Sequence, residues 1–458
     1  MADALSPADR SSLSAEQGPV SMAVGGVLVF DGSTGLDHAA VMRRLEGRLH
    51  LIPRYRQRLA TAAPGGLTNP VWVDDEAFEL GWHVRRAHAR NDAELAQLVG
   101  HEMSRKLDRG RPLWEMTVVE GLDGGRVALL PKMHHALVDG VAAVDVGTVV
   151  LDPTPEPMDL APQADWAPKA YDRRRHLARL AATPVVSAQR LLLDSATRAL
   201  AATDPRRAGS DLLRATELLT ELAKTRPQAP MTFLNRGIGP NRRYAMASAT
   251  LAELKAAGKA AGGTVNDAIL AVVAGMLGRL IGLAGESVKR PLVALVPVSV
   301  RRPGEEGGNR ISTVLVDLPV LVEDPLERIR AINATMGELK GSAAVRAGAL
   351  LVGASGWAPP LVSSTLARAM GGVRAFNLVV SNIPGPQQPF YLDGARLLDV
   401  YPVVPLNPAN QGLNVGVLSY DGGVRFGLLA DRDLAVPVDT ARDALRDAVS
   451  ELVSAGTA

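Results

Sequence analysis

The sequence has no cysteine and almost no excess charge, and both shortages exclude classes of protein. The absence of cysteine from 458 residues excludes a disulfide framework, a thiolate metal site and a cysteine acyl-enzyme. The 50 basic and 48 acidic residues give a formal net charge of +2, which argues against a nucleic-acid-binding protein. The composition is compatible with a reducing cytoplasm.

Signals of export and of two common enzyme classes are also missing. Residues 1–21 are polar and lack a basic start followed by an apolar run, so we expect no secretory signal and a cytoplasmic location. There is no Gly-x-Ser-x-Gly elbow, which disfavours a serine hydrolase. Gly237-Ile238-Gly239 lacks the third glycine of a dinucleotide-binding fingerprint.

The most specific feature that is present is the pattern His-His-x-x-x-Asp-Gly over residues 134–140, at the end of an apolar run. A neutral imidazole takes a proton from a hydroxyl or amine near pH 7, so His135 is the candidate general base. If the run is a strand, His134 faces the opposite side and has a supporting or packing role. Asp139, followed by Gly140 and the mostly apolar run 141–150, is expected to cap the next helix or to pair with an arginine.

This motif resembles that of the CoA-dependent acyltransferase superfamily, which includes chloramphenicol acetyltransferase, the condensation domains of peptide synthetases and the bacterial wax ester synthase/diacylglycerol acyltransferases. The last group is the most similar, because further stretches that look like it follow in the same order. They are Pro112-Leu113-Trp114, Asn266-Asp267, Gly308-Asn309-Arg310-Ile311-Ser312 and Ser381-Asn382-Ile383-Pro384-Gly385-Pro386. The resemblance therefore spans nearly the whole chain.

The resemblance implies an α/β fold of two chloramphenicol-acetyltransferase-like sandwich domains joined by a helical linker, with the active site in a tunnel between them. The length agrees, because 458 residues are too many for one hydrophobic core. We expect an N-terminal acyltransferase domain at 1–165, a basic helical linker at 166–232 and a C-terminal acyltransferase domain at 233–458.

The activity that the resemblance implies is O-acyl transfer. A long-chain acyl group would pass from acyl-CoA, a substrate, to diacylglycerol or to a long-chain alcohol, with His135 as base and without a metal or cofactor. A second enzyme hypothesis is transfer from a carrier-protein thioester onto an amine or a secondary alcohol, as in condensation domains and polyketide acyltransferases. A non-enzyme alternative is a lipid-droplet surface protein, which the intact histidines and Asp139-Gly140 disfavour.

Other side chains in these stretches keep two interpretations each. Trp114 is expected in the core or in a tunnel wall. Asn266 either supplies a polar contact near the site or caps a helix before Asp267. Ser381 and Asn382 are expected where a strand ends in a rigid Pro/Gly turn, and the resemblance implies that they border the site.

Hydrophobic patterning predicts the elements around these motifs. Pro131, which has no N–H for a ladder, predicts an edge strand or a bulge. The expected elements are a strand at Val24–Phe30, a hairpin of Met116–Glu120 and Arg126–Met133, a strand at Phe376–Val380, a helix at Val265–Leu283 and a final helix begun near Asp439.

Two stretches bear on contact with lipid. Lys169 to Arg226 has 12 Lys or Arg against 6 Asp or Glu, and it either attracts anionic headgroups or CoA phosphates or is a solvated connector. Ala347 to Ala367 has no charge, but its glycines and prolines disfavour a spanning helix. It is expected to line an acyl tunnel, to dip into a bilayer surface or to belong to the core. We therefore expect peripheral contact with a membrane or lipid droplet.

Overall fold

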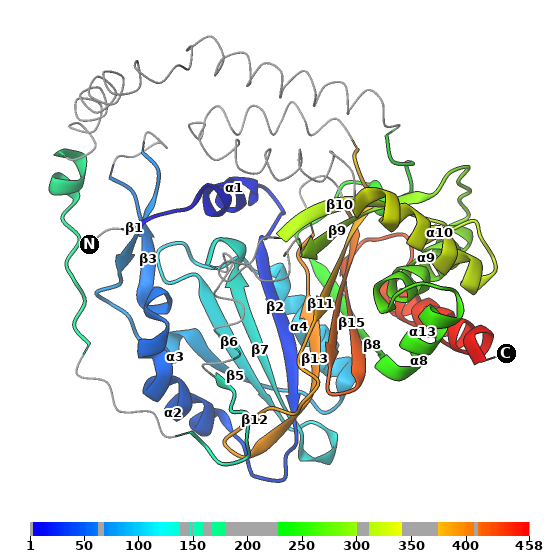
Figure 1. The fold of residues 1–458 in the computed structure, drawn as a ribbon. Coiled ribbons are helices and arrows are strands. Elements are labelled where there is room, and N and C mark those ends of the chain that lie inside the picture. Colours follow the sequence, from blue (N-terminus) through cyan, green and yellow to red (C-terminus); the bar gives the residue numbers. More distant parts are fainter. Residues whose placement is uncertain are drawn as a thin grey trace, which may run out of the picture.

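A computed structural model of the chain contains two large β-sheets, each with helices packed on it (Figure 1). It describes residues 3–62, 68–137, 147, 150–158, 166–178, 228–299, 311–340, 374–406 and 411–457. Within these residues, each large sheet has six strands, and a small sheet of three strands comprises β1 (Asp3–Ala4), β4 (Val71–Asp74) and β3 (Gln57–Ala60).

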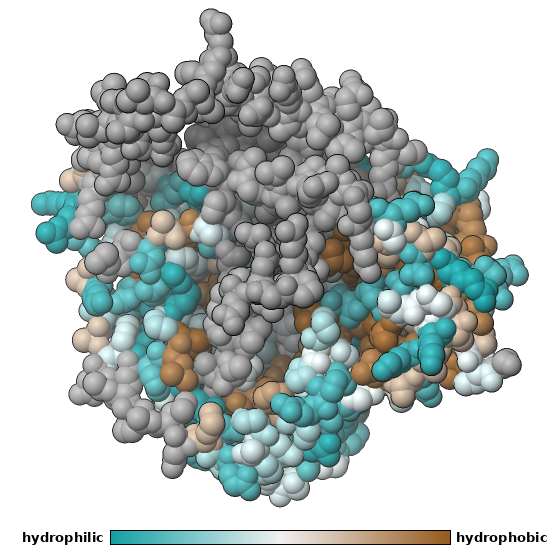
Figure 2. All heavy atoms as spheres, in the orientation of Figure 1, coloured by the Kyte–Doolittle hydropathy of each residue, from teal (hydrophilic) through white to brown (hydrophobic). Residues whose placement is uncertain are grey.

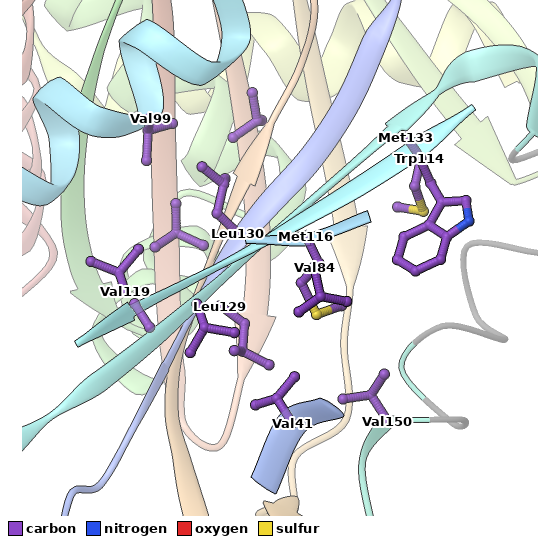
Figure 3. Packing of buried hydrophobic residues seen from close by; sticks show 14 of the residues in the cluster. Val41, Val84, Val99, Trp114, Met116, Val119, Leu129, Leu130, Met133 and Val150 are labelled. Carbon is purple, nitrogen blue, oxygen red and sulfur yellow. The ribbon is translucent and has the colours of Figure 1, made fainter. Parts of the chain in front are cut away.

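The first large sheet carries the two histidines. Its strand order is β12-β13-β2-β7-β6-β5, where β12 is Tyr391–Leu392, β13 Ala395–Val403, β2 Ala23–Phe30, β7 Val127–His134, β6 Trp114–Glu120 and β5 Val84–His88. Alternate residues of β7 face two different helices. Leu130 lies on the side of Val99 from α4 (Asp92–Ser104), and Leu129 on the side of Val41 from α2 (His38–Arg48) (Figure 3). Both leucines are at most 1% exposed.

Two predicted elements of this sheet are confirmed. β2 covers the predicted strand Val24–Phe30, and Asp37 caps α2 through a bond from the Ala40 N–H. β6 and β7 form the predicted hairpin, with Val118 opposite Leu129. Its turn contains Gly124 and Gly125, both at φ 72°, which glycine adopts without steric cost.

The prediction of an edge strand or bulge for Pro131 is wrong. β7 lies between β2 and β6, and Pro131 is opposite Met116 of β6. On the β2 side the ladder pairs residues 23–25 and 28–30 and leaves out Gly26 and Val27, with the same register on both sides of the gap. The strand therefore accommodates the missing N–H by a local interruption of one ladder.

The second large sheet has the order β10-β9-β11-β14-β15-β8. These strands are β10 Ile311–Leu318, β9 Leu292–Ser299, β11 Leu378–Pro384, β14 Leu413–Tyr420, β15 Gly423–Asp431 and β8 Arg242–Thr250. One face is covered by α8 (Leu251–Ala260), α9 (Val265–Leu283), α10 (Pro325–Lys340) and α13 (Val438–Thr457), which lie together to the right of the sheet in Figure 1.

Both helices predicted for this half are confirmed. α9 has the predicted bounds, and α13 begins at Val438, next to Asp439. By length and composition α9 is the one described helix apolar enough to cross a membrane, but 72% of its most apolar window is buried in the protein. That degree of burial is typical of a core helix. β11 begins two residues later than predicted and extends to Pro384.

The two halves of the chain share the first sheet. β13 comes from the C-terminal half, yet it pairs with β2, with Val400 opposite Leu28. The other face of the second sheet packs on the hydrophobic core around the first sheet, called the first core below. Tyr244 of β8 and Leu429 of β15 are buried in it. A strand from beyond the predicted domain start at 233 therefore belongs to the first sheet. The domain boundaries themselves stay a prediction, since residues 159–165 and 179–227 lie outside the described residues.

Replacing Gly427 with alanine should destabilise the packing between the two large sheets. A Cβ on Gly427 would lie 1.9 Å from the Pro402 carbonyl oxygen of β13 and 2.3 Å from the Tyr244 hydroxyl. Overpacking of this kind costs about 1–3 kcal/mol, so chemical denaturation should show a lower free energy of unfolding. Gly47→Ala is the control, because Gly47 is exposed in α2 with nothing within 4 Å of the added Cβ. This substitution should raise the free energy of unfolding by about 0.5–1 kcal/mol. Equal stability of the Gly427 variant and the wild type would contradict this packing.

Candidate active site

The end of β7 places two adjacent histidines in different surroundings. His134 is the last residue of β7 and is 0% exposed. His135 begins the short helix η4 (His135–Leu137) and is exposed. The structure thus separates a buried ring from a ring that solvent or a substrate can reach, as the alternation of strand side chains predicts.

The ring and the backbone of His135 contact the N-terminal segment. Its Nδ1 lies 3.4 Å from the Ser12 hydroxyl on α1 (Pro7–Ala15), and its backbone N–H donates to the Met22 carbonyl at 2.9 Å. When the ring proton is on Nδ1 and directed at Ser12, Nε2 keeps the lone pair that a general base requires.

The buried ring of His134 has a defined tautomer. Its Nδ1 accepts a hydrogen bond of 3.0 Å from the Ala136 backbone N–H. A peptide N–H can only donate, so Nδ1 carries no proton and the ring proton is on Nε2. That Nε2 faces the Glu16 carboxylate, with 3.6 Å to Oε2.

Glu16 is a buried carboxylate with several donors around it. It ends α1 and is 8% exposed. Oε1 accepts from the Met22 N–H at 3.1 Å, and Oε2 accepts from the Arg109 guanidinium at 2.9 Å. Burial alone would raise the pKa of Glu16, but the facing His134 ring, the Arg109 bond and the Met22 bond together lower it to about 2. Glu16 is therefore ionised at every pH at which the protein is expected to work.

Trp114 is a core residue, the first of its two predicted positions. It is 1% exposed and packs beside Met133 (Figure 3). Its indole N–H donates to the Tyr55 carbonyl at 2.8 Å, and its ring stacks on His83 at 4.6 Å between centroids. Burial lowers the pKa of His83 to about 4, so this stacked ring is neutral near pH 7.

The structure brings together two asparagines that the sequence placed in separate motifs. The Asn382 amide on β11 donates to the Asn266 side-chain oxygen at 3.0 Å. Asn266 is not the cap of α9, because Thr264 and Asp267 form the capping box. Its polar side chain is thus available for the contact with Asn382. Ser381 lies on the same strand, opposite Gly416.

The remaining predicted site residues cannot be placed. Asp139 and Gly140 lie outside the described residues, as does the stretch Ala347–Ala367. In the part of the chain that the structure describes, no group of three or more His, Asp or Glu side chains could hold a metal ion.

Sequence reasoning missed Ser12, Glu16 and Arg109, which complete the surroundings of the histidines. One signal was present for α1: Ser6-Pro7 followed by Asp9 is a capping box with proline at the first helical position, and the structure has both of its bonds. No local pattern shows that this helix packs against a turn more than a hundred residues later.

Comparisons with known proteins agree with the resemblance in the sequence. A family model described as the wax ester synthase/diacylglycerol acyltransferase catalytic domain matches residues 5–269, and the WS/DGAT C-terminal domain model matches residues 307–453. A putative diacylglycerol O-acyltransferase of Mycobacterium bovis is 35% identical over 445 residues, which cover 94% of this chain and 94% of that protein.

Two solved structures have the same fold. A wax ester synthase/diacylglycerol acyltransferase from Marinobacter aquaeolei VT8 superposes with a TM-score of 0.71 at 28% identity, covering 99% of this chain and 100% of that one. A mutant starter condensation domain of rhizomide synthetase, in complex with C8-CoA and Leu-SNAC, superposes with a TM-score of 0.58 at 15% identity, covering 100% of this chain and 95% of that one. The predicted α/β fold of chloramphenicol-acetyltransferase type is confirmed.

Ionised Glu16 should stabilise the fold in a pH-dependent way. Its pKa falls from 4.5 to about 2 on folding, so the stabilisation is complete above pH 4.5 and is lost as the pH falls toward 2. The melting temperature of the wild type should exceed that of Glu16→Gln at neutral pH, and the difference should disappear near pH 2. Differential scanning fluorimetry of both proteins across this range checks the prediction. A difference that does not change with pH would contradict it.

Proposed function

The chain belongs to the wax ester synthase/diacylglycerol acyltransferase family, and from that membership we propose a reaction in which His135 is the general base. The protein is an O-acyltransferase that moves an acyl group to the hydroxyl of diacylglycerol or of an alcohol. The observation that carries the role of His135 is its exposed ring at the end of β7, with Ser12 at Nδ1 and with its backbone held by Met22.

The reaction follows from the chemistry of an imidazole next to a thioester. Nε2 of His135 takes the proton of the acceptor hydroxyl while that oxygen attacks the thioester carbonyl carbon of acyl-CoA. The new C–O bond gives a tetrahedral oxyanion, which collapses as the C–S bond breaks. The imidazolium then protonates the departing CoA thiolate, and the base is regenerated.

A positioned base accounts for only part of the rate. General-base catalysis contributes about 10²- to 10⁴-fold, so donors to the tetrahedral oxyanion must contribute much of the remainder. Asp139 and Gly140 follow His135 in the motif, and we propose that Asp139 holds the turn rather than touching the substrate.

His135→Ala should abolish most of the transfer and leave the protein folded. The ring is exposed, and the backbone N–H that bonds to Met22 is retained, so we expect an unchanged melting temperature and at least an about 10²-fold loss of kcat. The loss should exceed that of His134→Ala. The assay supplies purified protein with palmitoyl-CoA and, in turn, diacylglycerol, hexadecanol and monoacylglycerol, and identifies the esters formed.

His101→Ala is the matched control, because His101 is an exposed histidine on α4. Wild-type turnover in the His135 variant at matched stability would remove His135 from the mechanism. Ester formation by the wild type without a carrier protein supports an acyl-CoA donor, whereas strict dependence on a carrier-protein thioester would favour the second enzyme hypothesis.

We further propose that the protein is cytoplasmic. Because its lipid substrates are insoluble in water, we also propose that it binds membranes or lipid droplets peripherally. The described start of the basic stretch supports this. Arg173, Arg174 and Arg175 are exposed. The Arg173 side chain donates to the Ala62 carbonyl at 2.7 Å, and the Lys169 N–H to Asp74 at 3.0 Å. These contacts hold the cationic segment against the N-terminal half.

Binding to vesicles should depend on these arginines. Each Lys or Arg near an anionic surface adds about 1 kcal/mol, and salt screens the attraction. Cosedimentation with liposomes should rise with phosphatidylglycerol content, fall with added salt and weaken when Arg173, Arg174 and Arg175 become Gln. Lys106, Lys255 and Lys259 are exposed elsewhere, and their triple Gln variant is the control of equal charge. Vesicle binding that changes neither with salt nor with the arginine substitutions would contradict the proposal and would favour binding through an apolar patch.

A further inference from the structure

We propose that Glu16 is the positioning residue of His135, holding the backbone on both sides of the catalytic ring without touching the substrate. The inference rests on the proposed role of His135 as general base. It concerns a residue outside the His-His-x-x-x-Asp-Gly motif, and it follows from the contacts of two consecutive peptide groups.

The two N–H groups that flank the Cα of His135 each lead to the same carboxylate. The His135 N–H donates to the Met22 carbonyl at 2.9 Å, and the Met22 N–H donates to Glu16 Oε1 at 3.1 Å. The Ala136 N–H donates to His134 Nδ1 at 3.0 Å, and His134 Nε2 faces Glu16 Oε2 at 3.6 Å. One buried carboxylate therefore holds one end of the residue that carries the base by hydrogen bonds through Met22, and it lies against the His134 ring that holds the other end.

The carboxylate is itself held in one position. Arg109 approaches Oε2 with its terminal nitrogen at 2.9 Å and its Nε at 3.3 Å. The same guanidinium donates to the Leu13 carbonyl of α1 at 2.9 Å. A buried charge with a paired cation and several donors is fixed in orientation, so it can fix the groups bonded to it.

The remaining contacts of α1 do not require Glu16. Ser6 and Asp9 cap its first turn, and Leu5 and Leu13 are buried in the first core. Loss of the carboxylate should therefore leave the helix docked and should loosen residues 134–136. Misplacement of a catalytic group by about 1 Å costs on the order of 10²-fold in rate, so the effect belongs to kcat rather than to substrate binding.

The test compares Glu16→Gln with Glu120→Gln. Glu120 is a control in the sheet that carries the histidines, because it also accepts from a backbone N–H, that of His38 at 3.0 Å, and from an arginine, Arg86 at 2.8 Å. It lies at the far end of β6 from the histidines. We expect Glu16→Gln to lower kcat by about 10- to 100-fold, with KM for acyl-CoA within about twofold of wild type, and Glu120→Gln to leave both unchanged.

Hydrogen exchange provides a readout that general destabilisation would not reproduce. In Glu16→Gln the peptide covering residues 134–137 should lose more protection than peptides from α4 and β6. Glu16→Asp retains the charge but shortens the side chain, so its kcat should lie between those of Gln and the wild type. It also keeps the proposal testable if the Gln variant does not fold.

A Glu16→Gln variant with the kcat of the Glu120 control and unchanged exchange at 134–137 would overturn the proposal. This outcome is distinct from failure of the proposed function, which would appear as full activity in His135→Ala. An inactive His135 variant together with a fully active Glu16 variant would leave the base in place and remove only its positioning residue.

Discussion

The backbone pairing of β13 with β2 is the constraint on which the rest of the structure depends. β13 belongs to the C-terminal half of the sequence, and by entering the first sheet it makes the two halves one hydrogen-bonded structure. β2 in turn pairs with β7, so the strand that ends in the histidines is the second neighbour of the strand that crosses over. The close approach of Gly427 to Pro402 shows how little space separates the sheets at this point.

Buried charges fasten segments that are far apart in sequence to this framework. Arg242 pairs with Asp431 at 3.2 Å and also donates to the Pro19 carbonyl at 2.9 Å, which lies in the loop between Glu16 and Met22. The second half thereby holds the loop that bonds to His135. Burial of an ion costs desolvation free energy that a partner charge offsets, and removal of one partner of a buried pair is strongly destabilising. The ion pair of buried Glu16 with the half-exposed Arg109 likewise joins α1 to a distant segment.

The parts of this arrangement that the sequence predicts are those encoded locally. β2, the β6–β7 hairpin, α9 and α13 follow from hydrophobic period, turn glycines and caps, which act over a few residues. The histidine pair was found because its motif is contiguous. Long-range contacts were not predictable in this way, because nothing near Glu16 indicates His134 and nothing near Asn266 indicates Asn382. Pro131 was misplaced because the rule for proline does not anticipate a ladder that is interrupted opposite Gly26 and Val27.

The central claim is that the hydroxyl attacks acyl-CoA directly, with His135 as base and no acyl-enzyme. Intact-protein mass spectrometry after incubation with palmitoyl-CoA alone tests it most directly. We expect the protein to keep its unmodified mass and to release CoA only when hexadecanol or diacylglycerol is added, with one ester formed for each CoA. A palmitoylated protein that forms without acceptor and then passes its acyl group to the alcohol would contradict the account.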